Sequence, residues 1–129
     1  MSISPSIDRE GFLRALALRF AEIAESITDI ESGLLHPEMA VVSHATQKAI
    51  EARSWQTVAA HFSFIAGVFA GGTAEVRNAV CVSYLENLFL DEASGNHVST
   101  RATLPPVLAS ALVDLENHFE MLSHAKHGA

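Results

Sequence analysis

The sequence predicts an all-α protein, built either as a compact bundle or as a short stack of helix pairs like that of helical-repeat proteins. Apolar residues recur three and four positions apart in five segments, and no segment alternates with a period of two. Ser, Thr, Gly or Pro residues mark the boundaries of these segments. The 129 residues, 49% of them apolar, suffice for one hydrophobic core. We therefore predict a single helical domain over residues 1–129.

Two helices are predicted in the first part of the chain. The first covers residues 7–31, where the apolar residues form one stripe and Gly33 is a natural stop. Ser6 is placed to cap its first turn. The second covers residues 37–53 and starts at Pro37, which suits the first position of a helix, although its apolar face is weak.

The next two helices have the highest proportion of apolar residues. A helix over residues 55–70 has an apolar stripe that widens beyond one face, and a helix over residues 74–90 is apolar almost all round. Gly71-Gly72 separates the two, and Thr73 is placed to cap the second. Because a helix that is apolar on all sides has to be central, we expect residues 74–90 in the middle of the bundle.

The last part of the chain contains the one long loop that the sequence predicts. This polar stretch covers residues 91–104 and includes Gly95-Asn96. Pro105-Pro106 is tolerated only in a first helical turn, so the last helix is predicted over residues 105–123. The residues after it are expected to fray.

Composition excludes some classes of partner. Acidic residues outnumber basic ones by 15 to 8 and no basic cluster is present, so we expect no nucleic acid partner. The longest mainly apolar run, residues 58–72, is too short and too polar to span a bilayer. The N-terminus shows no secretory signal. We therefore expect no membrane partner and a cytoplasmic location.

The residue types that carry catalysis or hold metals do not occur in the required patterns. The seven histidines form neither Glu-x-x-His nor His-Glu-x-x-His, the single cysteine lies in an apolar run, and no glycine-rich phosphate loop is present. We therefore predict no metal site, no cofactor and no catalytic residue set, and hence a protein that is not an enzyme. His61, inside an apolar helix, is expected to be partly buried and bonded to a backbone carbonyl.

A resemblance comes from the segment Asn78 to Leu88, which ends in Val-Ser-Tyr-Leu-Glu-Asn-Leu. This segment resembles a signature, with Phe or Tyr at the aromatic position, in a family of small, largely uncharacterised bacterial all-helical proteins. The similarity extends over residues 54–122. It implies a helical fold and no known catalytic residue set, and it carries over no binding residue. Some members are associated with polymorphic toxin systems as immunity partners, so the resemblance also implies a protein partner.

The leading interpretation is a non-catalytic protein-binding module, such as an immunity or antitoxin-type inhibitor of a basic partner, either a toxin or an enzyme. The net charge of −7 would speed encounter with such a partner. Three carboxylates, three and four residues apart, form an acidic row on the outer face of the first predicted helix. The candidate partner-binding residues are this row and polar residues of the predicted loop: Glu22, Glu25, Asp29, Asp91, Glu92, His97 and Arg101.

Two alternatives stay open. In the first, the chain is a small-ligand or metal-binding helical bundle in which His61, Tyr84 and His118 converge on a pocket. In the second, it is a homo-oligomeric structural domain, such as a homodimer. Leu18 on the outer side of the first helix and the helix that is apolar all round motivate this second alternative.

Overall fold

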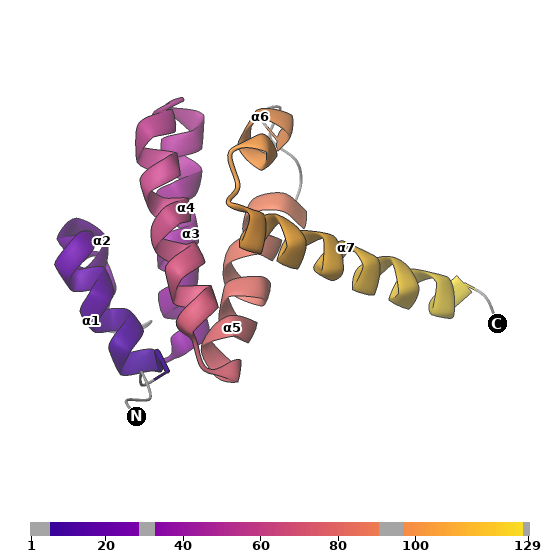
Figure 1. Cartoon of the computed structure of the whole chain (residues 1–129), viewed down its shortest axis with the longest axis horizontal. Coiled ribbons are helices and arrows are strands. Elements are labelled where there is room, and N and C mark those ends of the chain that lie inside the picture. Colours follow the sequence, from indigo (N-terminus) through magenta and orange to yellow (C-terminus); the bar gives the residue numbers. More distant parts are fainter. Residues whose placement is uncertain (1–5, 29–32, 91–96, 128–129) are drawn as a thin grey trace.

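The computed structural model describes residues 6–28, 33–90 and 97–127, and this part of the chain is an all-α bundle (Figure 1). No helix in these ranges is long and apolar enough to cross a membrane. The helices follow one another along the chain as α1 (Arg9–Arg19), α2 (Ala21–Glu25), α3 (Leu35–Glu51), α4 (Trp55–Gly71), α5 (Ala74–Val80), η1 (Cys81–Leu90), α6 (His97–Ala102) and α7 (Pro106–His127).

The core lies where α3, α4 and the α5–η1 segment pack together. Figure 1 shows the α1–α2 arm on one side of the α3–α4 pair and α5–η1 on the other, while the end of α7 runs away from the other helices. Phe12 of α1, Phe62 of α4 and Tyr84 of η1 are fully buried among aliphatic side chains. The Phe62 and Tyr84 rings meet edge to face, with their centroids 6.4 Å apart. Burial of these large rings joins three helices that are distant in sequence.

The first predicted helix, 7–31, is wrong as one continuous element, because it breaks at Phe20. This residue leaves the helical conformation (φ −139°, ψ 66°) and directs its ring onto α4. There the ring meets His61 and Phe64 edge to face, with centroids 4.9 Å and 5.4 Å away. Packing therefore overrides helix propensity at this position. Asp8, not Ser6, caps α1, since its carboxylate accepts a 2.8 Å hydrogen bond from the backbone N–H of Gly11.

The predicted helix over 74–90 changes its winding halfway. It starts as α5, where the Thr73 side chain caps the first turn as the sequence predicted, and continues as the π-helix η1. A π-helix has i→i+5 hydrogen bonds and more residues in each turn than an α-helix. Val80, Tyr84 and Leu85 are fully buried, and Leu88 and Phe89 are nearly so. These residues recur every four to five positions, so the wider turn aligns them on one buried face.

The predicted loop over residues 91–104 is wrong in its second half, since residues 97–102 form α6. Arg101 of α6 makes two hydrogen bonds with the carboxylate of Glu116 on α7, which fastens the short helix to the long one. The last helix was predicted to end at residue 123, but α7 continues to His127. Residues 91–96 lie outside the described part of the chain.

The chain start is fastened at the turn between α4 and α5. Ile7 forms a single parallel β-bridge with Gly72: its N–H donates to the Gly71 carbonyl at 2.7 Å, and its carbonyl accepts from the Thr73 N–H at 2.9 Å. Gly72 has no room for a side chain, because a Cβ atom there would lie 2.6 Å from the Val68 carbonyl oxygen. The joint therefore needs glycine for a close backbone approach rather than for an unusual φ angle.

Candidate binding site around helix α2

Helix α2 is the least buried helix of the N-terminal half, and it is flanked by two grooves. None of its five residues is buried. The first groove, which we call the α2–α3 groove, has a volume of about 570 Å³. The second, which we call the His61 groove, has a volume of about 600 Å³ and lies towards α4. Glu22, Ile23 and Ala45 line both grooves, so α2 forms the wall between them.

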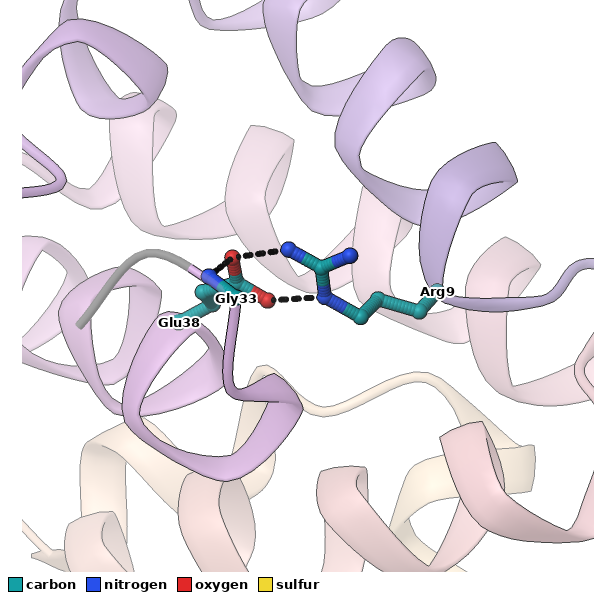
Figure 2. A network of polar contacts seen from close by, with 3 residues as sticks. All are labelled: Arg9, Gly33 and Glu38. Carbon is teal, nitrogen blue, oxygen red and sulfur yellow. Dashed lines mark hydrogen bonds and ion pairs between the residues drawn. The ribbon is translucent and has the colours of Figure 1, made fainter.

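An ion pair with a buried carboxylate joins the start of α1 to the first turn of α3 (Figure 2). Arg9 of α1 donates from Nε and Nη2 to the two carboxylate oxygens of Glu38, at 2.8 Å and 2.7 Å. The Gly33 backbone N–H donates to Glu38 Oε2 at 3.0 Å. Glu38 is only 1% exposed, so all three donors replace the water that its carboxylate loses. The hydrogen bond with this carboxylate also raises the pKa of the Arg9 guanidinium.

The α2–α3 groove combines an apolar floor with charged edges. Half-buried apolar residues of α3, including Ala40 and Val41, form the floor. Glu22 stands exposed on the α2 edge, and Lys48 and His44 stand exposed on the α3 edge. This combination suits an amphipathic partner segment, whose apolar face would meet the floor and whose polar side chains would meet the two edges.

The floor of the His61 groove is a buried polar network centred on Thr46. The Thr46 hydroxyl donates to the Val42 carbonyl at 3.1 Å. His61 Nδ1 lies 2.9 Å from the same Oγ1 atom and the Tyr84 hydroxyl lies 2.8 Å from it. A hydroxyl has one proton to give, so when Thr46 donates to the Val42 carbonyl it accepts from both of these neighbours. In that arrangement His61 Nδ1 carries a proton and the Tyr84 hydroxyl proton points at Thr46.

Burial sets the protonation state of this network. Burial lowers the pKa of His61, which favours the neutral imidazole, and it raises the pKa of Tyr84 well above its usual range. Both groups are therefore neutral at pH 7 and act through hydrogen bonds rather than charge. No buried side-chain nitrogen or oxygen in the described part of the chain lacks a hydrogen-bond partner.

Sequence reasoning found part of this network and missed its centre. His61 is buried, as expected, but its partner is the Thr46 hydroxyl rather than a backbone carbonyl. Tyr84 meets the same hydroxyl, whereas His118 is exposed on α7 and does not converge with them. The signal that pointed to Thr46 is its position between Val42 and Ile50 on the buried face of α3, where a polar residue needs partners.

Of the predicted partner-binding residues whose side chains the structure describes, Glu22 and Glu25 lie on a different part of the surface from Arg101. Glu22 and Glu25 are both exposed on α2. Because α2 ends at Glu25, the predicted row of three carboxylates on one helix is wrong. Arg101 belongs to the ion pair with Glu116, and Figure 1 places α6 across the α3–α4 pair from α2. The backbone of His97 begins α6. The remaining predicted residues lie outside the described part: Asp29, Asp91 and Glu92.

Groups with metal-binding or nucleophilic chemistry are sparse in the residues that the structure describes. Among them, no three His, Cys, Asp or Glu side chains gather closely enough to hold a metal ion. Cys81 is half-buried, and burial raises the pKa of its thiol, so the reactive thiolate is disfavoured. A third groove, about 660 Å³ in volume, runs past Cys81 between Phe69 and α7.

The comparisons with known proteins point to one family. A model of the family described as a domain of unknown function (DUF7674) matches residues 13–120, which include α2, both grooves beside it and the Thr46 network. Neither the curated proteins nor the solved structures gave a match to the chain.

Proposed function

The chain belongs to the DUF7674 family, and we propose that it is a protein-binding module that holds a basic partner protein on the α2–α3 groove. One observation carries this proposal: an apolar floor lies open beside a helix that buries none of its residues and presents two carboxylates to solvent. Capture of a toxin or other basic enzyme, as immunity proteins and antitoxins do, is the form of binding that we propose.

Charge supports the choice of a basic partner. The chain carries a net charge of −7, and Glu22 and Glu25 lie one helical turn apart on the exposed side of α2. An acidic surface attracts a basic protein during diffusion and raises the association rate. Lys48 on the opposite edge would select, within that basic partner, a segment with an acidic or amide side chain at the matching position.

Helix α3, which forms the floor of the α2–α3 groove, is held in place by contacts with neighbouring helices. Thr46 of α3 is buried and forms hydrogen bonds with His61 of α4 and Tyr84 of η1, and Glu38 joins α3 to α1. A surface that is already in place pays no ordering entropy when a partner docks. The half-buried Ala40 and Val41 would lose their remaining contact with water on docking, which favours association.

The charge contribution is tested with Glu22→Lys and with Asp114→Lys as a control. Both variants make the same change at an exposed carboxylate, but Asp114 is on α7, away from α2. The partner probe is the purified product of the gene adjacent to the one encoding this chain, and binding kinetics are measured at two salt concentrations. We expect Glu22→Lys to lower the association rate by about tenfold at low salt and the control to lower it much less. Equal effects of the two variants would contradict the proposed surface.

The groove floor is tested with Ala40→Phe, which fills it, and with Ala59→Phe, which places the same ring on the exposed side of α4. We expect the floor variant to weaken binding of the same partner by at least about tenfold and the control to leave it unchanged. Circular dichroism checks that both variants stay folded. A floor variant that is folded and binds normally would exclude this groove as the contact surface.

A further inference from the structure

We propose that the His61 groove is a second, separate site, which binds a small molecule with an apolar body and one hydroxyl or N–H donor. The site lies on the α4 side of α2, whereas the proposed protein surface lies on the α3 side. It depends on one atom, Nε2 of His61, which the Thr46 network leaves as a hydrogen-bond acceptor facing the groove.

The role of Nε2 follows from how the Thr46 proton is used. Thr46 Oγ1 is placed to donate to the Val42 carbonyl, and in that arrangement the Nδ1 atom of His61 donates to Thr46. A neutral imidazole with a proton on Nδ1 has a bare lone pair on Nε2. Burial favours the neutral ring, because desolvation lowers the pKa of His61. The ring therefore presents an acceptor, and a ligand has to supply the donor.

The position of Nε2 follows from burial and hydrogen-bond accounting. The His61 side chain is 5% exposed and lines the groove. The hydrogen bond of His61 is made through Nδ1, and within the described residues no buried side-chain nitrogen lacks a partner. Nε2 has no such partner, so it is not buried, and because His61 lines the groove we infer that Nε2 faces it. A nearly buried polar group with one open atom is typical of a ligand site, where a few placed polar groups fix the orientation of the ligand.

The remaining walls define the ligand class. The Phe20 ring stands edge-on to His61 at 4.9 Å between centroids, and Ile23 and Ala60 add apolar surface. Gln56 and Thr57 bring polar groups to the α4 side of the groove. At about 600 Å³ the groove has the volume of a small-molecule site. An aromatic or aliphatic ring bearing a hydroxyl or N–H group fits these walls.

The network also holds the histidine in place. Tyr84 and the Val42 carbonyl hold Thr46, Thr46 holds His61, and Phe20, which lies between α1 and α2, packs edge to face with the His61 ring. Thr46 and Tyr84 do not reach the ligand, so they are positioning residues. This preorganisation means that the imidazole needs no rearrangement before it accepts a hydrogen bond.

The first test measures the tautomer in the wild-type protein. NMR correlations between ring nitrogens and ring protons in ¹⁵N-histidine-labelled protein report which nitrogen of His61 carries the proton. We expect Nδ1 to be protonated and Nε2 to be bare at pH 7. A proton on Nε2 would overturn the proposal, because the atom facing the groove would then be a donor.

The second test compares two probes of the same shape, phenol and toluene, in titrations of the wild-type protein followed by the same spectra. Phenol carries the donor, whereas toluene carries a methyl group in its place. We expect phenol to bind about tenfold more tightly than toluene and to shift the Nε2 resonance. Equal affinity, tighter binding of toluene, or a phenol complex that leaves the Nε2 resonance unchanged would each overturn the proposal.

Two variants locate the effect. His61→Phe keeps an aromatic ring but removes the acceptor, so the preference for phenol over toluene is expected to vanish. Ser63→Ala, at an exposed position of α4 outside the groove lining, is expected to keep that preference. If His61→Phe kept the preference for phenol, His61 would not be the acceptor and the proposal would be overturned. If His61→Phe does not fold, the tautomer and the two probes still decide the question in the wild-type protein.

Discussion

The N-terminal and C-terminal regions of this protein are each fastened by an Arg–Glu pair, but the two pairs differ in burial. In the first, the Glu38 carboxylate is 1% exposed and accepts from Arg9 and from the Gly33 backbone. In the second, the Arg101 and Glu116 side chains are 41% and 36% exposed. Both are bidentate. The two pairs therefore differ mainly in the carboxylate, which is buried at the N-terminal end and exposed at the other, since Arg9 is itself 33% exposed.

Burial decides what each pair contributes to stability. In water, an exposed ion pair gains little, because solvent screens the charges and the long side chains lose entropy. A buried carboxylate has already lost its water, so each remaining donor is needed and removing one is costly. We therefore expect loss of the Arg9–Glu38 pair to lower the free energy of unfolding more than loss of the Arg101–Glu116 pair.

The largest expected effect comes from Glu38→Gln. The amide keeps the size of the side chain, but its NH₂ group faces N–H donors of Arg9 or Gly33, so at least one buried hydrogen bond is lost. We expect the free energy of unfolding to fall by about 2–3 kcal/mol in urea denaturation. Glu51→Gln, at the exposed end of α3, is the matched control, with a change under about 0.5 kcal/mol. Similar losses for both would contradict a special role for the buried pair.

The next largest effect on stability is expected at Gly72, in the turn between α4 and α5 that contacts Ile7 at the start of the chain. A Cβ atom at Gly72 would lie 2.6 Å from the Val68 carbonyl oxygen, which belongs to the backbone and cannot move without distorting α4. We expect Gly72→Ala to cost about 2 kcal/mol, measured by thermal or urea unfolding. At Gly71 the nearest atom would be Ile7 Cδ1 at 3.1 Å, the far end of a flexible side chain. Gly71→Ala is therefore the control and should cost under about 1 kcal/mol.

These buried contacts also mark where the fold was hard to predict from sequence. Periodicity located the helical segments, because it reports which residues face a core. It missed the break at Phe20 and the π-helix from Cys81, since both depend on what the segment packs against. The backbone breaks at Phe20 because its ring packs on His61, and the winding of the apolar helix from Cys81 depends on the helices around it. A local sequence pattern contains neither kind of information.

The candidate site divides in the same way. Glu22 and Glu25 were predicted on an exposed face from their spacing and charge, and both are exposed. Their relation to Asp29 was wrong because α2 ends at Glu25. Thr46 was missed, although its spacing from Val42 and Ile50 places it on the buried face of α3, because the sequence does not show which residues it bonds. Its hydroxyl forms hydrogen bonds with His61 of α4 and Tyr84 of η1. These contacts depend on how the helices pack and are not visible in the sequence.

The buried His61 makes the stability of the protein depend on pH. Burial lowers the pKa of His61 below its ordinary value of 6.5, so near that pH the unfolded chain binds more protons than the folded one. The contribution to stability is therefore complete above pH 6.5 and is lost as the pH falls through the lowered pKa. We expect the melting temperature to fall between pH 7 and pH 5, and less so in His61→Gln. An identical pH profile in this variant would show that other groups cause the change.

The smallest effect is expected at the exposed pair. Glu116→Gln removes a charge that is already well solvated, so the loss should stay under about 0.5 kcal/mol and shrink further in high salt. Hydrogen bonding with Arg101 lowers the pKa of Glu116, so its contribution is present above the ordinary pKa near 4.5 and is lost as the pH falls through the lowered value. Urea denaturation at pH 7, with and without 1 M NaCl, measures this loss against that of Glu38→Gln. Equal losses of stability in Glu116→Gln and Glu38→Gln would contradict the expectation that burial of the Glu38 carboxylate, and its additional Gly33 donor, make the N-terminal pair the more stabilising one.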